Sequence, residues 1–220
     1  MGLVKALTPQ WLALSGATVN GRYGAVGAMK EALLAGEPCD VMVVTDSMVA
    51  SLVAGGSLRA SGVGALGRVR TGLAVPSGSP RPDVHTPEAL RDALLAADAI
   101  YFPDPERATA GIHFAKVMRE LGIFELLAPR FRTHPNGATA MREMAAADRP
   151  RAIGCTQVSE ILYSEGVALV AALPAAFELA TLYTAAVATG AAEPALAQQF
   201  IALLCGAPAQ ALRAEGGFES

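Results

Sequence analysis

The sequence predicts an α/β protein, because short, continuously apolar runs alternate with longer segments of helical pattern. The apolar runs lie at residues 41–44, 73–75, 99–102, 152–154 and 168–171. A run that is apolar at every position is typical of a strand buried on both faces, and such strands favour a parallel sheet covered by helices.

Helix signals separate these runs. Residues 28–35 place apolar side chains on one face and stop at Gly36, and residues 112–121 do the same before Gly122. The Thr-Pro pair at residues 86–87 is typical of an N-cap followed by proline at the first helical position. The strand runs are therefore expected to be connected by amphipathic helices.

Composition limits the classes of function. The 220 residues, 52% hydrophobic and 17% charged, suffice for one large domain or two small lobes. A net charge of −3 provides no general basic field, and 5% aromatic residues offer little surface for stacking bases, so we expect no nucleic-acid partner. No apolar run approaches the roughly 18 residues of a membrane span, so we expect none.

The first residues and the metal-ligating residue types bear on localisation and cofactors. Lys5 falls inside what would be the apolar part of a secretory signal, and Pro9 follows soon after. As written, this start predicts a cytoplasmic protein; a start further upstream would allow a periplasmic one. The three cysteines (39, 155, 205) and three histidines (85, 113, 134) lack ligand spacing, so no metal or cofactor is expected.

Residues 23–29 form a glycine-rich helix entrance, and residues 36–46 form a strand entrance of the pattern G-x-P-x-D-V. In this order they resemble type II periplasmic solute-binding proteins of the molybdate-binding group. The resemblance continues through residues 104–111, 153–162, 173–174 and 183–187, and through two C-terminal helices at 194–204 and 210–218. It covers nearly the whole chain.

The resemblance implies a two-lobed type II periplasmic-binding-protein-like fold with parallel-dominated sheets. Lobe 1 would comprise residues 1–74 and 176–220, and lobe 2 residues 75–175. Two crossings, near residues 71–75 and 173–179, would connect the lobes, with the ligand in the cleft between them.

One departure from the family concerns its first central strand. Residues 1–14 match the helix that follows that strand, so the strand is expected to be missing. Loss of a central strand costs more than the roughly 5–15 kcal/mol by which a domain is stable. We therefore expect either that the natural start lies upstream, or that another segment or chain compensates beside residues 41–44, or that a strand there is left exposed.

Two helix entrances are the main candidates for contacting a ligand. Free N–H groups and the positive dipole end suit a helix N-terminus to holding an anion. Residues 23–27 and 109–111 are such entrances, although their small residues also suit tight turns. The candidate ligand-binding residues are Tyr23, Ala25, Val26, Gly27, Thr45, Asp46, Arg107, Thr109, Ala110, Gly111, Asn136, Thr156 and Gln157.

Several of these residues allow two interpretations. Val26 stands where the family has a serine, which disfavours a compact oxyanion and leaves room for an organic acid, but it can equally be a packing residue. Arg107 pairs with a carboxylate or stays exposed, and Asn136 faces the cleft or only forms a turn. Gln157 is the preferred polar contact after its strand. Glu160 is favoured as a hinge or capping residue over a catalytic base.

The predicted function is a solute-binding domain that closes on a small anion, either a molybdate-like oxyanion or a small organic carboxylate. It would serve an ABC-transporter permease or act as a sensor, and a homo-oligomer remains open. The alternative is an isomerase of a small polycarboxylate, as in aconitate isomerase, with Glu160, Asp46 or Tyr23 as base. The absence of a His–carboxylate pair favours binding, and no catalytic residue is assigned.

Overall fold

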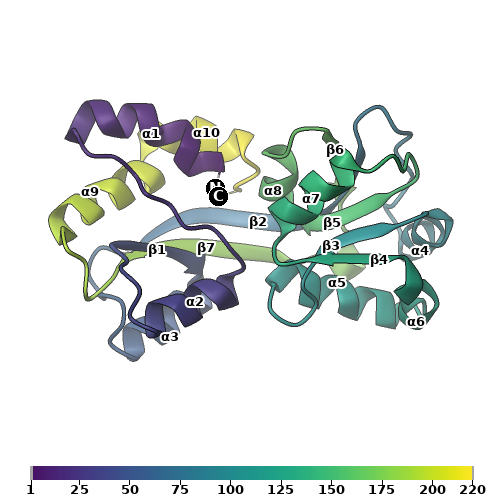
Figure 1. Cartoon of the computed structure of the whole chain (residues 1–220), viewed down its shortest axis with the longest axis horizontal. Helices are drawn as coiled ribbons and strands as arrows, with labels where there is room; N and C mark the ends of the chain where they lie inside the picture. Colours follow the sequence, from purple (N-terminus) through teal and green to yellow (C-terminus); the bar gives the residue numbers. More distant parts are fainter. Residues whose placement is uncertain (1, 220) are drawn as a thin grey trace. The chain divides into compact units, whose positions relative to one another are not determined.

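The computed structural model describes residues 2–219; Met1 and Ser220, the outer ends of the first predicted lobe, lie outside the described residues. The chain divides into two compact units, the first formed by Met1–Val69 with Thr181–Ser220 and the second by Arg70–Ala180. Each contains both helices and strands (Figure 1), as an α/β fold of two lobes requires. The cleft expected between the lobes stays a prediction.

Unit 1 combines helices from both ends of the chain. Its elements are α1 (Gly2–Ser15), α2 (Val26–Leu34), β1 (Val41–Thr45), α3 (Asp46–Ala54), the first part of β2 (Gly64–Pro76), most of β7 (Ala180–Val187), α9 (Pro194–Cys205), the 3-10 turn η3 (Ala207–Ala209) and α10 (Gln210–Glu215). Helix α1 buries Leu3, Leu7 and Trp11, which recur every four residues on one face. The Trp11 ring meets Phe200 of α9 edge-on at 5.0 Å, so the two ends of the chain share a core.

The expected pair of C-terminal helices is present as α9 and α10. Helix α9 buries a stripe formed by Ala197, Phe200, Ile201, Leu203 and Leu204. No single helix within residues 2–219 is long and apolar enough to cross a membrane. The segments Pro194–Cys205 and Ala207–Glu215 meet that criterion only when joined, and they are bent by 51°.

Unit 2 is a sheet with helices on both faces. It contains the rest of β2, α4 (Pro87–Ala96), β3 (Ile100–Pro103), α5 (Thr109–Glu120), α6 (Phe124–Leu127), η1 (Ala128–Arg130), β4 (Phe131–His134), α7 (Gly137–Ala146), β5 (Ile153–Gln157), α8 (Val158–Leu162), β6 (Val167–Ala172) and η2 (Ala175–Phe177). Leu73 and Cys155 pack with Phe114 of α5 on one face, whereas Ala74 and Tyr101 pack with methionines of α7 on the other. Figure 1 shows α5 and α7 on opposite sides of these strands.

The sheet is mixed, so the parallel-dominated arrangement expected from the continuous apolar runs holds only in part. Strand β3 is parallel to β4 and β5, but β2 is antiparallel to β5 and β6, and β1 is antiparallel to β7. Parallel neighbours need a crossover connection, usually a helix. Strand β2 enters unit 2 directly from unit 1, without a crossover helix. It runs antiparallel to β5, one of the parallel strands that the helices connect.

Strand β1 lies at the end of the strand order, and within residues 2–219 it pairs only with β7. The N–H of Ala188 donates to the carbonyl of Asp40 at 3.0 Å, which identifies this facing pair as a hydrogen-bonded one. Because bonded and non-bonded pairs alternate in an antiparallel ladder, the even-numbered residues of β1 bond to β7. The odd-numbered residues direct their N–H and C=O groups to the open side, the exposed edge expected beside residues 41–44.

Hydrogen exchange along β1 should therefore alternate. We expect the amides of Met42 and Val44 to be protected because they donate to β7, and those of Val41 and Val43 to exchange much faster. Amide-resolved NMR after transfer into D2O measures the four rates. Similar protection of all four amides would contradict an open edge and reveal a further strand paired with β1.

Candidate functional site

The first turn of α5 presents backbone donors with no partner among the described residues. The N-cap residue, Ala108, has no side chain that could bond to this turn, although its carbonyl accepts from Ile112 at 2.9 Å. The N–H groups of Thr109, Ala110 and Gly111 precede the first intrahelical donor and remain free. Together with the helix dipole they form a concentration of positive potential suited to an anion.

The loop before α5 is held by its own hydrogen bonds. One carboxylate oxygen of Asp104 accepts the N–H groups of Glu106 at 2.8 Å and Arg107 at 3.2 Å. The N–H of Asp104 donates to the carbonyl of His134 in β4 at 2.8 Å. These bonds set the position of the α5 entrance relative to β3 and β4, while Arg107 lies exposed in the loop.

Gly111 allows α5 to approach the end of β3 closely. A Cβ atom at this position would lie 2.3 Å from the carbonyl oxygens of both Pro103 and Asp104. No side chain fits at that distance, so packing alone explains why residue 111 is a glycine. Its backbone N–H is nonetheless one of the three free donors of the turn.

Polar side chains also gather at the carboxyl end of the neighbouring strand β5. Gln157, the last residue of β5, faces Thr71 of β2 in register, so both side chains project from the same face of the sheet. Both are buried, with exposed fractions of 4% for Gln157 and 1% for Thr71. A side chain at Gly72, on the opposite face, would meet Val158 of α8, so Thr71 and Gln157 lie on the α5 face.

Sequence reasoning missed Thr71, which it assigned only to a crossing segment. The hydroxyl oxygen of Thr71 is buried and has no hydrogen-bond partner among the described residues. The available signal was a single hydroxyl at the head of the apolar run at 73–75. This signal is weak, because threonine is common in strands for reasons of packing.

The N-terminus of α7, in contrast, is occupied by the protein itself. The side chain of Asn136 accepts the N–H of Thr139 at 2.9 Å, and Glu160 accepts the N–H of Ala138 at 3.2 Å. The hydroxyl of Thr156 donates to the other carboxylate oxygen of Glu160. Asn136 and Thr156, two predicted ligand contacts, therefore support a helix cap, and Glu160 takes the capping role favoured for it.

The entrance of α2 in unit 1 is open in the same way as that of α5. Its N-cap residue, Ala25, makes no side-chain cap, and its carbonyl accepts from Met29 at 3.0 Å. The N–H groups of Val26, Gly27 and Ala28 have no partner among the described residues. Thus α2 offers three free donors of its own.

Tyr23 lies just before this entrance and is exposed. Its ring covers the backbone at Gly21, where a Cβ atom would lie 2.2 Å from the tyrosine oxygen. Partial burial raises the pKa of the Tyr23 phenol above its usual value. A phenol with a raised pKa is a poor base at neutral pH.

Thr45 and Asp46, at the end of β1, both have partners within unit 1. The Thr45 hydroxyl oxygen accepts the N–H of Met48 at 3.4 Å and caps α3. The carboxylate of Asp46 accepts the hydroxyl of Thr184 in β7 at 2.9 Å. Helices α3, α4 and α7 thus carry side-chain caps, from Thr45, Thr86 and Asn136 respectively, whereas α2, α5 and α9 do not.

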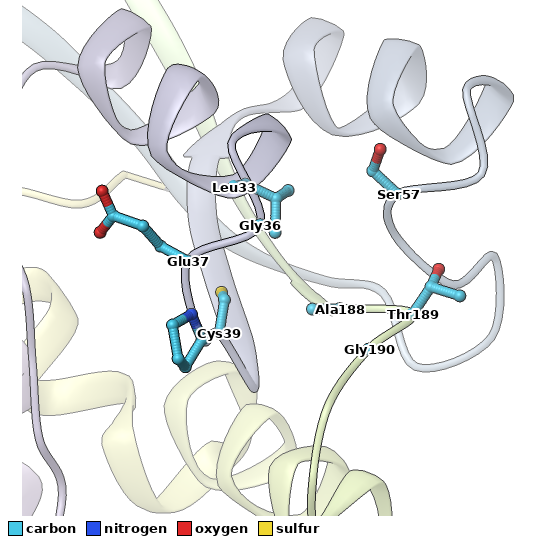
Figure 2. Close-up of a pocket in the computed structure, with 9 residues that line it drawn as sticks. Leu33, Gly36, Glu37, Cys39, Ser57, Ala188, Thr189 and Gly190 are labelled. Atoms are coloured by element: carbon cyan, nitrogen blue, oxygen red, sulfur yellow. The ribbon is translucent and has the colours of Figure 1, made fainter.

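A pocket of about 260 Å³ lies in unit 1 at the opposite end of β1 from Thr45 (Figure 2). It is lined by Leu33, Gly36, Glu37, Pro38, Cys39, Ser57, Ala188, Thr189 and Gly190. Burial, followed by the charge of Asp40, raises the pKa of the Cys39 thiol, so it is not a reactive thiolate at neutral pH. None of the predicted contact residues lines this pocket.

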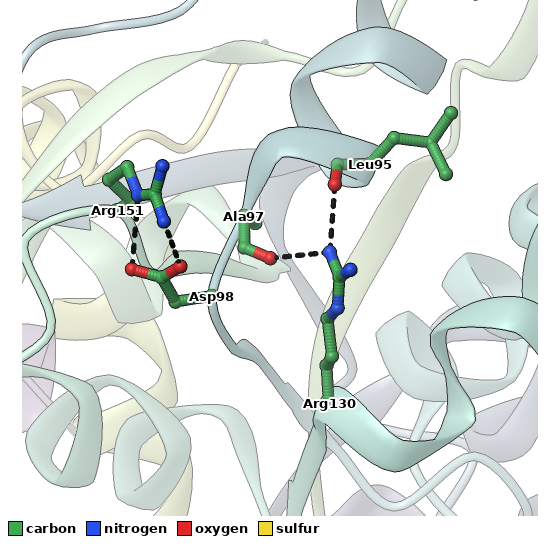
Figure 3. A network of polar contacts seen from close by, with 5 residues as sticks. All are labelled: Leu95, Ala97, Asp98, Arg130 and Arg151. Atoms are coloured by element: carbon green, nitrogen blue, oxygen red, sulfur yellow. Dashed lines mark hydrogen bonds and ion pairs between the residues drawn. The ribbon is translucent and has the colours of Figure 1, made fainter.

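Two arginines stabilise the end of unit 2 where β3 and β5 begin (Figure 3). Arg151 forms a two-pronged ion pair with Asp98, with N···O distances of 2.5 and 3.1 Å. Arg130 donates to the carbonyls of Leu95 and Ala97 at 2.7 and 2.9 Å and so satisfies the C-terminus of α4. These contacts are structural. Across residues 2–219, no three His, Cys, Asp or Glu side chains are grouped to hold a metal ion.

The Glu160 carboxyl generates a prediction about stability and pH. Burial raises its pKa above the ordinary value, and the bonds from Thr156 and Ala138 only partly oppose this shift. The folded protein therefore binds this proton more tightly than the unfolded chain does. The contribution of Glu160 to the free energy of unfolding should decline as pH rises from the ordinary glutamate pKa to the raised one.

We expect E160Q to remove this decline, because the amide does not ionise. Thermal unfolding of the native protein and E160Q, followed between pH 4 and 8, measures the difference between them. The native protein should lose stability relative to E160Q as pH rises through the window. A difference that grows in favour of the native protein over that window would refute the raised pKa.

Known proteins that resemble this chain have the same two-lobed α/β fold. The family model described as bacterial extracellular solute-binding protein matches residues 1–219. The periplasmic molybdate-binding protein of Azotobacter vinelandii superposes with a TM-score of 0.81 at 18% identity, covering 100% of this chain and 94% of that one. The sulfate-binding protein SubI of Mycobacterium tuberculosis gives 0.75 at 18% identity, covering 99% and 82%.

An aconitate isomerase from Pseudomonas sp. is 25% identical over 181 residues, which is 80% of this chain. The matched region spans 66% of that enzyme's length. The family model, which extends over nearly every residue, identifies the chain as a member of the bacterial extracellular solute-binding protein family, with a fold like that of molybdate- and sulfate-binding proteins.

Proposed function

We propose that this solute-binding domain holds a small anion at the first turn of α5; the first turn of α2, in unit 1, is a second candidate for binding an anion. The observation that carries the proposal is the contrast among helix entrances. Helices α3, α4 and α7 are closed by their own side chains, whereas α2 and α5 are not. Helix α9 also lacks a side-chain cap, but it begins at Pro194, which has no N–H to offer. Three free N–H groups at each open turn provide the donors that an oxyanion or carboxylate needs.

The polar surroundings of the α5 turn support the same site. Gln157 lies on the α5 face at the end of the adjacent strand, where open α/β sheets bind their ligands. Arg107, exposed in the loop directly before the turn, adds a positive charge. Asn136 and Thr156 act indirectly, by fixing the neighbouring α7 entrance.

The family supports a proposal about the partner and the location. An extracellular solute-binding protein delivers its ligand to a membrane permease, so we propose an ABC-transporter permease as partner and a periplasmic location. A sensor that uses the same domain would keep the anion site and dispense with the permease. Co-purification with a permease in detergent distinguishes the two roles.

The second candidate function is isomerisation of a small polycarboxylate, which the aconitate isomerase relative favours. Such a reaction requires a base beside the substrate. Glu160 is engaged at α7, Asp46 accepts from Thr184, and Tyr23 has a raised phenol pKa. These engagements favour binding over catalysis. Conversion of cis-aconitate into trans-aconitate, followed by NMR, would establish the enzymatic alternative.

Thr109→Pro tests the α5 site, because proline at the first helical position removes one N–H without breaking the helix. Ala108 already has the extended conformation that proline requires of its predecessor, with φ −104° and ψ 129°. We expect the affinity for the best anion to fall about tenfold or more, as for loss of one hydrogen bond to a charge. Calorimetric titration measures it.

The anion is first chosen by thermal shift against molybdate, sulfate, phosphate, citrate and succinate. At 100 times its dissociation constant, a ligand stabilises by about 2.7 kcal/mol. Thr109→Ala is the matched control, because it removes the hydroxyl but keeps the N–H. Unchanged affinity in a folded Thr109→Pro protein would place the site elsewhere. Gly111→Pro is unsuitable, since its ring atoms would collide with β3.

Val26→Pro tests the contribution of α2 separately. Ala25 has φ −58° and ψ 143°, which again suits a following proline. We expect about tenfold weaker binding of the same anion for Val26→Pro, and near-native binding for Val26→Ala, which keeps the N–H. Native affinity in Val26→Pro would restrict the site to α5.

A further inference from the structure

The hydroxyl of Thr71 is a buried polar group that the fold itself does not use. The N–H of Thr71 donates to the carbonyl of Leu179 at 2.9 Å, and its carbonyl accepts from Leu173 at 3.0 Å. The backbone is thus fully bonded, and only the hydroxyl oxygen lacks a partner among residues 2–219. Thr71 is only 1% exposed, so the fold buries this oxygen without pairing it.

A buried hydroxyl without a partner is unfavourable, and native proteins pair most such groups. Valine has nearly the same shape and would fill the position without that penalty. The hydroxyl therefore requires an explanation other than packing. A ligand oxygen or ligand hydroxyl is a suitable partner, because a threonine hydroxyl both donates and accepts.

Thr71 lies on the same face of the sheet as α5. Thr71 and Gln157 share a face of the sheet, and two residues further along β2 Leu73 packs against α5 on that face. The segment from the end of η2 onward contacts both elements: the carbonyl of Phe177, the last residue of η2, contacts the His113 ring of α5 at 2.7 Å, and the carbonyl of Leu179 accepts from the N–H of Thr71. Thr71 thus lies toward the carboxyl ends of β3 and β5, where α5 begins.

We infer that Thr71 is a specificity-determining contact, and that the ligand is an organic acid with a second oxygen-bearing group that reaches it. This inference rests on the proposed anion site at α5. Strand β2 lies two strands from β3, which is about 10 Å. A carbon skeleton with a carboxylate at the α5 turn and a second oxygen group at Thr71 and Gln157 spans that separation better than one tetrahedral oxyanion.

The test compares Thr71→Val with the native protein in calorimetric titrations of succinate, citrate, cis-aconitate, molybdate and sulfate. We expect the native protein to bind at least one of the organic acids more tightly than either inorganic anion. Thr71→Val should bind that acid about tenfold more weakly. Its melting temperature without ligand should be equal or higher, because the substitution removes an unpaired hydroxyl.

Thr189→Val is the matched control, since Thr189 lines the pocket of Figure 2 and its hydroxyl donates to the carbonyl of Gly56. Its affinity for the organic acid should be native. Native affinity in Thr71→Val, or tighter native binding of molybdate or sulfate, would overturn the inference while leaving the α5 site intact. Failure of every anion to bind the native protein would overturn the proposed function itself.

Discussion

The close approach of α5 to the end of β3 is the constraint on which the candidate site depends. A Cβ atom at residue 111 would lie 2.3 Å from the carbonyl oxygens of Pro103 and Asp104. Residue 111 must therefore be a glycine for the helix to begin where it does. The bonds of Asp104 to the loop and to β4 fix the same starting point. Three backbone donors are consequently held in place before any ligand arrives, which reduces the ordering that binding requires.

The entrances of α5 and α7 differ in what satisfies their first-turn donors. At α7, the carboxylate of Glu160 and the amide oxygen of Asn136 satisfy the first-turn donors. Gly137 makes this possible, since a side chain there would collide with Thr156 and Glu160. At α5 no such side chain is present among the described residues, so its first-turn donors are open to the proposed anion. The α7 arrangement stabilises unit 2, whereas the α5 arrangement is the basis of the proposed site.

The open edge of β1, in contrast, is a part of unit 1 where backbone hydrogen bonding is incomplete among the described residues. Met42 and Val44 are buried, and the strand is bonded on one side to β7, yet its other side presents free backbone groups. An apolar edge without charge or proline is a surface that natural sheets normally cover. We therefore expect unit 1 to be more prone than unit 2 to pair its sheet edge with another chain. The sheet of unit 2 is covered by helices on both faces.

The sequence by itself determined the element order, because continuous apolar runs and stop signals such as Gly36 and Gly122 depend only on local pattern. It also indicated the entrances at residues 23–27 and 109–111, since small residues before a helix are visible in the chain. The caps from Thr45, Thr86 and Asn136 are likewise local, since each residue directly precedes its helix. Only the tertiary structure showed that Glu160, from 22 residues away, also satisfies the α7 entrance. The antiparallel course of β2 and the unpaired hydroxyl of Thr71 depend likewise on neighbours distant in sequence, which no local pattern specifies.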